Sequence, residues 1–157
     1  KEGFDVIYTK KDGTKIYVEM KNKHNTMNSS SSQKTYMRML NKIASDNKAE
    51  CYLVEVIAKN SQNIVWKVSL DGERMENERI RRVSMDKFYE IVTGDKEAFY
   101  KICMELPKLI DEIIEENREL QVGSDTVVNE LREKNPDLLK ALYLLAFKEY
   151  EGFKNLE

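Results

Sequence analysis

The sequence predicts an α/β (α+β) protein: a mixed β-sheet that begins with a hairpin, contains one crossover helix and is followed by a layer of helices. Three observations predict it. Residues 3–21 contain two runs of alternating apolar and polar residues around a turn. A helical stripe leads directly into the apolar run 49–58, and a strand–helix–strand order places the two strands parallel in one sheet. From residue 84 onward, apolar residues recur mostly at helical spacing.

Length and composition predict a single domain. The chain has 157 residues, of which 34% are charged and 41% apolar, as is usual for a globular protein with a well-solvated surface. We expect one domain over residues 1–157, with a sheet core at 3–83 and a helical layer at 84–157. Because the chain starts at Lys1 and enters the hairpin almost at once, we also expect an N-terminal part to be missing. The net charge of −2 neither indicates nor excludes nucleic-acid binding.

Cysteine, histidine and hydropathy patterns exclude several classes of protein. Cys51 and Cys103 lie far apart in apolar surroundings, without metal-ligand spacing, which predicts reduced core thiols and a cytoplasmic location. His24 is the single histidine, so sites that need two imidazoles are excluded. No apolar run approaches the length of a membrane span, and we expect no membrane partner.

The length of the hairpin turn decides which side chains share a face. A two-residue Asp12-Gly13 loop would set Asp5 opposite Met20. A three-residue loop that begins at Lys11, with Gly13 in the left-handed position, sets Asp5 opposite Glu19. The second register gives the cleaner pattern. One face then carries Asp5, Ile7, Tyr17, Glu19 and Lys21, and the other is an uninterrupted apolar face for the core, with Val6, Tyr8, Ile16, Val18 and Met20.

Two carboxylates and a lysine on one face have a chemical use. Asp5 and Glu19 can hold a hard divalent cation such as Mg2+, which prefers carboxylates, water and phosphate oxygens. Lys21 lies two residues beyond Glu19 and can orient an attacking water or stabilise charge as a phosphodiester is attacked. The alternative is an exposed hairpin whose charged side chains are merely solvated.

A polar connection over residues 22–32 leads into the crossover helix. Ser30 with Gln33 fits a capping box, so we expect the cap rather than a DNA contact for Gln33. The apolar stripe consists of Tyr36, Met39, Leu40, Ile43 and Ala44. Lys34, Arg38 and Lys42 recur every four residues on another face, either as a solvated stripe or as a rail for DNA phosphates.

The remaining elements follow from local patterns. Strands are expected at 49–58 and 64–70, with a short edge strand at 80–83 whose Arg81 and Arg82 either touch phosphate or are simply exposed. A helix capped by Ser84 or Asp86 should stop at Gly94. A second helix, from residue 95, contains Pro107, where we expect a kink or a new start. Further helices are expected at about 127–134 and after the Asn-Pro-Asp triplet at 135–137.

The hairpin motif resembles that of a known nuclease superfamily. Asp5 followed by Glu19-Met20-Lys21 is similar to the PD-(D/E)xK motif, with Phe4 where a proline often stands. The extended run from Glu19 to Asn28 (EMKNKHNTMN), with Phe88-Tyr89-Glu90 and Thr93-Gly94, resembles the type II restriction endonucleases that cut GGNCC- or GGWCC-type sites. The resemblance covers roughly residues 3–96 and implies a restriction-endonuclease-like fold.

The resemblance also implies a reaction and roles for residues. The expected activity is Mg2+-dependent hydrolysis of double-stranded DNA at a short, G/C-rich, near-palindromic site, as part of a restriction-modification system. Asp5 and Glu19 would bind the metal, with the Met20 carbonyl as a further ligand, and Lys21 would complete the catalytic set. A near-palindromic site suggests a homodimer.

Side chains just beyond the catalytic strand are candidates for DNA contact, since amides can read adenine and cations can read guanine or bind phosphate. They are Lys23, His24, Asn25 and Asn28, with Thr26 beside them and Lys34 and Arg38 on the helix. An ordinary Asn-rich loop that caps backbone groups is the alternative. Two rival functions also stay open, a repair or junction-resolving nuclease of the same fold and a catalytically silent DNA-binding domain.

Overall fold

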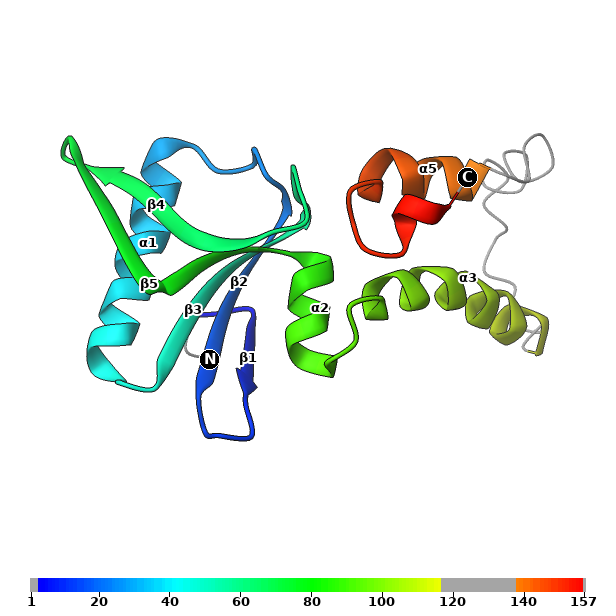
Figure 1. Ribbon diagram of the computed structural model, residues 1–157, viewed down its shortest axis with the longest axis horizontal. Coiled ribbons are helices and arrows are strands. Elements are labelled where there is room, and N and C mark those ends of the chain that lie inside the picture. The colour runs from blue at the N-terminus through cyan, green and yellow to red at the C-terminus, as the bar shows by residue number, and fades with distance from the viewer. Residues whose placement is uncertain (1–2, 117–137, 157) are drawn as a thin grey trace. The chain divides into compact units, whose positions relative to one another are not determined.

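The computed structural model describes residues 3–116 and 138–156, and the chain divides into two compact units, residues 1–96 and 97–157. The first unit contains a five-stranded mixed sheet in the order β1-β2-β3-β5-β4, which confirms the predicted fold class (Figure 1). Its elements are β1 (Val6–Thr9), β2 (Lys15–Lys23), α1 (Ser29–Ser45), β3 (Ala49–Ile57), β4 (Asn63–Leu70), β5 (Glu73–Ser84) and α2 (Met85–Thr93). As predicted, β2 and β3 are parallel neighbours joined through α1.

The hairpin turn has the predicted three-residue loop. The Lys10 N–H donates to the Thr14 carbonyl at 2.8 Å, and Gly13 has a φ of 84°, a left-handed conformation that favours glycine. The register follows: Val6 lies opposite Val18 and Thr9 opposite Lys15. A three-residue loop, closed by Lys10 and Thr14, thus fixes the pairing of β1 with β2.

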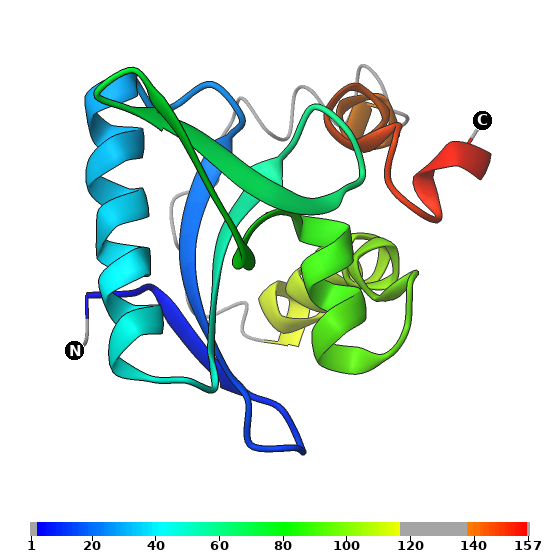
Figure 2. The same cartoon turned by 60° about the vertical axis from the view of Figure 1, so that its left-hand side comes forward.

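Helices cover both faces of the sheet, whereas the sequence placed the core on one face. Figure 2 shows α1 and α2 on opposite sides of the strands. Ile16 and Val18 are fully buried on the predicted apolar face. Tyr17, assigned to the open face beside Glu19, is also buried, because it belongs to a core cluster with Tyr36 and other residues of α1. The face that carries Tyr17, Glu19 and Lys21 is therefore buried at Tyr17 and only partly covered at Glu19 and Lys21.

The N-terminus of α1 differs from the predicted capping box. The cap is Asn28, whose side-chain oxygen accepts the Ser31 N–H at 2.8 Å, rather than Ser30. Gln33 does not cap the helix either, because its amide donates to the Ser69 carbonyl of β4 at 2.8 Å. Four serines in a row give no local preference for one cap position, and the asparagine before them makes the bond.

The strand predicted at 80–83 is much longer and is not at the edge. β5 spans Glu73–Ser84 and lies between β3 and β4. Its first half is mostly charged and pairs with β4, partly through the ion pair between Lys67 and Glu76 at 2.9 Å, and only Met75 from this half packs against the core. Charged residues without apolar alternation hide such a strand from pattern analysis.

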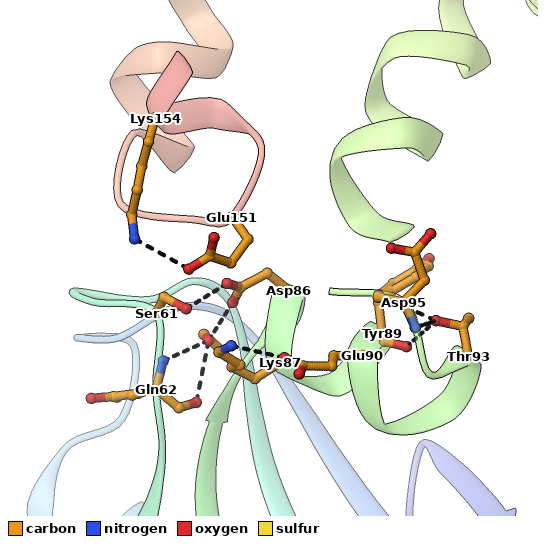
Figure 3. A network of polar contacts seen from close by, with 11 residues as sticks. Ser61, Gln62, Asp86, Lys87, Tyr89, Glu90, Thr93, Asp95, Glu151 and Lys154 are labelled. Atoms are coloured by element: carbon orange, nitrogen blue, oxygen red, sulfur yellow. Dashed lines mark hydrogen bonds and ion pairs between the residues drawn. The ribbon is translucent and has the colours of Figure 1, made fainter. Parts of the chain in front are cut away.

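A buried polar network fixes the start of α2 (Figure 3). Ser84 is the N-cap residue; its hydroxyl accepts the Gln62 N–H at 2.9 Å and donates to the carboxylate of Asp86. Asp86 also accepts from the Ser61 hydroxyl at 2.5 Å and is 1% exposed. Gly94, with a φ of 80°, ends the helix as predicted.

The second unit contains α3 (Ala98–Glu116), α5 (Leu138–Phe147) and a 3-10 helix, η1 (Phe153–Asn155). Pro107 lies inside α3, which continues past it instead of restarting. Aromatic rings form the core of this unit, with Phe99 and Phe147 at 5.1 Å between centroids.

The helix expected at 127–134 and the triplet at 135–137 lie outside the described residues. Among the helices that are described, none is long and apolar enough to cross a membrane. The single-domain organisation stays a prediction.

Candidate active site

Asp5 lies directly before β1 and points to the edge of β2. Its N–H donates to the Val18 carbonyl at 2.9 Å, and its carboxylate accepts the Met20 N–H at 2.8 Å. The ladder itself stops at Val6, so Asp5 is not part of the regular pairing that would place it squarely opposite Glu19. Since the Met20 nitrogen is bonded to the carbonyl carbon of Glu19, the Asp5 carboxylate lies beside the peptide bond that joins Glu19 to Met20. The Met20 carbonyl leaves the strand on the same side as its N–H, toward Asp5.

Glu19 projects from β2 toward α1, where it meets two cations. One carboxylate oxygen accepts from the Lys21 ammonium at 2.8 Å, and the other forms an ion pair with the Arg38 guanidinium. The Glu19 side chain is only 13% exposed, so these interactions are less screened than those of a surface pair. Glu19 and Lys21 thus lie together as predicted, and Arg38 of α1 forms a second ion pair with Glu19.

A small polar pocket of about 90 Å³ lies beside Lys21. One wall is an ion pair between Glu55 of β3 and Arg82 of β5, with a closest distance of 2.5 Å, and Glu55 is 2% exposed. Lys21 and Glu55 are register partners on adjacent strands. The lining residues are Lys21, Lys23, His24, Met27, Ser32, Leu53, Glu55, Trp66 and Arg82. Positive charges outnumber negative ones, which suits a group that carries phosphate.

The loop after β2 carries most of the predicted DNA contacts. The His24 N–H donates to the Ile57 carbonyl at 3.2 Å, and its own carbonyl accepts from Arg82 at 2.9 Å, so the backbone is tied to two strands. Thr26 closes the turn through its hydroxyl, 2.9 Å from the Lys23 carbonyl. The exposed side chains of Lys23, His24 and Asn25 are therefore displayed on a fixed backbone. Asn28 uses its side-chain oxygen as the helix cap, which leaves its amide group for any contact with a base.

The three basic residues of α1 do not act as a uniform stripe. Lys34 is exposed. Arg38 binds Glu19, and Lys42 lies over the Tyr17 ring at 4.3 Å. The rail for phosphates therefore stays a prediction for Lys34, whereas Arg38 already has an anionic partner within the protein.

Two features of the site were missed from sequence. Glu55 lies in the strand predicted at 49–58 and alternates with Cys51 and Leu53, which are core residues. An acidic residue at a core position indicates a buried ion pair, because acidic side chains are almost never fully buried unless they are paired. The partnership of Arg38 with Glu19 joins a helix to a strand across 19 residues, and no local pattern contains that information.

The donor set fits a hard divalent cation. Asp5 and Glu19 offer carboxylate oxygens, and Met20 offers a carbonyl at the same edge. Nowhere in the described ranges do three or more His, Cys, Asp or Glu side chains gather into a metal centre. Magnesium does not need such a cluster, because it keeps waters and takes phosphate oxygens from its substrate.

Comparison with known proteins identifies the family. Residues 1–115 match the model of the Eco47II restriction endonuclease family. The type II restriction enzyme Sau96I of Staphylococcus aureus is 32% identical over 124 residues, which cover 74% of this chain and 47% of that enzyme. The chain thus spans about half the length of this curated relative. No solved structure matches significantly. With the family model matching most of its length, the chain belongs to the Eco47II restriction endonuclease family.

Proposed function

We propose that the chain carries the catalytic centre of a type II restriction endonuclease, which hydrolyses both strands of DNA at a short, G/C-rich, near-palindromic site. The observation that carries the proposal is the arrangement of Asp5, Glu19 and Lys21 at one end of β2 in a member of this family. The relative named above is itself a type II restriction enzyme. The wider assignment to the PD-(D/E)xK superfamily rests on the same three residues.

Magnesium is the proposed cofactor, held by Asp5, Glu19 and the Met20 carbonyl. When bound, it supplies Lewis-acid stabilisation of the phosphate and of the charge that develops on it. Asp5 is pre-positioned for this role because the Met20 N–H fixes its carboxylate. The Lys21 ammonium, now 2.8 Å from Glu19, would orient the attacking water or stabilise the charge on the phosphorus oxygens.

DNA would lie along the loop that follows β2. Lys23, His24 and Asn25 are exposed there, and the polar pocket beside Lys21 opens among them. Lys34 on α1 and the free amide group of Asn28 extend the same surface. We assign phosphate contacts to the cations and base contacts to the amides, following their hydrogen-bonding chemistry.

A homodimer in the cytoplasm, within a restriction-modification system, completes the proposal. Two identical catalytic centres related by a two-fold axis match the symmetry of a near-palindromic site. The two buried, free thiols, Cys51 and Cys103, are compatible with a reducing compartment.

Digestion of a plasmid of known sequence tests the function. The protein with Mg2+ should give discrete fragments that carry 5′-phosphates, and end sequencing should return one short site. Glu19→Gln, which keeps the size of the side chain but removes its charge, should abolish cutting. Nicks that follow DNA structure instead of sequence would point to a repair or junction-resolving nuclease. DNA binding without any cutting would point to a silent binding domain.

A further inference from the structure

Arg38 connects three parts of the site from its place on α1. One guanidinium nitrogen binds Glu19, and the other donates to the Gly3 carbonyl at 2.6 Å. The guanidinium carbon also lies 4.8 Å from the centre of the Phe4 ring. Gly3 and Phe4 directly precede Asp5, so Arg38 touches both the segment that carries one acid and the side chain of the other.

Both carboxylate oxygens of Glu19 already have a cationic partner. Lys21 binds one oxygen and Arg38 the other. A divalent metal needs a lone pair of at least one of these oxygens, and a neighbouring positive charge opposes its arrival. Each oxygen keeps a second lone pair, but a metal bound there is repelled by the cation that stays, so the departure of one nitrogen partner favours metal coordination.

Arg38 is the partner that can leave with less loss. Its Nε is buried and has no hydrogen-bond partner among the described residues, so the guanidinium is not optimally satisfied where it lies. Its side chain is 40% exposed and has room to turn outward. Lys21, in contrast, belongs to the same strand as Glu19 and lines the polar pocket.

We propose that Arg38 is a positioning residue that competes with the metal for Glu19, so that the Arg38–Glu19 ion pair weakens metal coordination by Glu19. In the metal-free protein the ion pair neutralises Glu19 and holds the segment before Asp5 against α1. Metal binding then carries the free-energy cost of breaking that pair. This inference rests on the proposed metal site.

Calorimetric titration of the whole chain with Mn2+ alone, without DNA, tests the competition. Arg38→Met removes the competing charge but keeps the length of an unbranched side chain, and it should tighten Mn2+ binding about tenfold, the factor expected for one lost charge-assisted hydrogen bond. Arg38→Lys, which keeps a charge but loses the planar fork, should fall between the two. Lys48→Met is the matched control, because it removes an exposed charge near Lys15, at the opposite end of β2, and should leave the affinity unchanged.

The outcomes separate this inference from the proposed function. Glu19→Gln should remove Mn2+ binding in any background. If Glu19→Gln removes binding but Arg38→Met leaves the affinity of the wild type or weakens it, Arg38 does not compete and the inference is wrong, while the metal site stands. If the wild type and Arg38→Met both bind no Mn2+, the metal site and the inference fail together. Should Arg38→Met not fold by circular dichroism, Arg38→Lys and Arg38→Gln give the same comparison, and unchanged affinity in both would overturn the competition.

Discussion

At the scale of single residues, the site is organised by the backbone of β2. The Met20 N–H fixes Asp5, and the alternation of the strand sends Glu19 and Lys21 to the face that α1 covers. The positions of Glu19 and Lys21 therefore depend on one strand, and a hydrogen bond ties Asp5 to that same strand. Substitutions of Asp5, Glu19 or Lys21 should therefore lower the rate of DNA cleavage more than they lower the free energy of unfolding.

Lys21→Ala tests the proposed role of the ammonium group. In the proposed role Lys21 stabilises charge on the reacting phosphate, so the cleavage rate should fall at least about a hundredfold, in the range found when a group that stabilises transition-state charge is removed. DNA affinity, measured by fluorescence anisotropy with Ca2+ in place of Mg2+, should change little. Lys11→Ala, in the exposed hairpin turn, is the control. Parallel losses of binding and cutting would show that Lys21 serves mainly to hold DNA.

Cys51 predicts how stability depends on alkaline pH. Burial raises the pKa of this thiol from 9.0 to about 12. The unfolded chain therefore releases the proton first, and the free energy of unfolding should decline as the pH rises from 9 toward 12, by at most about 1.4 kcal/mol per pH unit from this group. Urea unfolding of the wild type and Cys51→Ala across this range measures the difference. Equal slopes would contradict the burial of the thiol.

At the scale of elements, α1 is the part on which the site depends most, and residues from other segments hold its ends. Asn28 caps the N-terminus. At the other end, Arg79 of β5 donates to backbone carbonyls in and beyond the last turn, including that of Asn47 at 3.0 Å. A cation at that position also favours the negative end of the helix dipole. The strand that was hardest to find in the sequence thus supports the helix that carries Arg38.

Arg79→Met should lower the free energy of unfolding by about 1–2 kcal/mol, since several carbonyls lose a charged donor. Urea denaturation followed by far-ultraviolet circular dichroism measures this. Arg74→Met on the same strand is the control, because Arg74 is 71% exposed and its ion pair with Glu76 is long, at 3.9 Å. Similar effects of the two substitutions would mean that the contacts of Arg79 add no stability.

Elements with local signals were predictable, and those that depend on distant partners were not. The turn at Lys11–Gly13 fixes its own geometry, so the pairing of β1 with β2 followed from the sequence. The parallel position of β3 followed from the crossover. The charged half of β5, and the ion pairs Arg38–Glu19 and Arg82–Glu55, arise only when strands and a helix far apart in sequence meet. The cap formed by Asn28 was not predicted, because a side-chain amide before a helix suits a cap as well as the base contact expected for this residue.

At the scale of the whole molecule, the site belongs to one of two compact units. Every residue proposed for metal or DNA binding lies within residues 1–96, and that unit has its own core beneath α1. The second unit has a separate aromatic core, where Gly152, with a φ of 87°, would place any added Cβ 2.5 Å from the Tyr100 ring. Each unit thus has its own buried core to stabilise its fold.

A fragment of residues 1–96 tests this division. It should unfold cooperatively and bind Mn2+ with the affinity of the whole chain, because the proposed ligands and the strands that position them are all included. Calorimetric titration and thermal unfolding are the measurements. A fragment without a cooperative transition would support the single-domain organisation predicted from the sequence.

The short strand β1 determines what the protein loses first on warming. It has four residues, lies at the end of the strand order with β2 as its neighbour in the described sheet, and leaves Val6 36% exposed. Strands of this kind open in local fluctuations well below the temperature of global unfolding. The amides of β1 should therefore exchange with deuterium sooner than those of β3. On warming, the protein should lose affinity for the proposed metal ion while the circular dichroism signal of its helices is still complete.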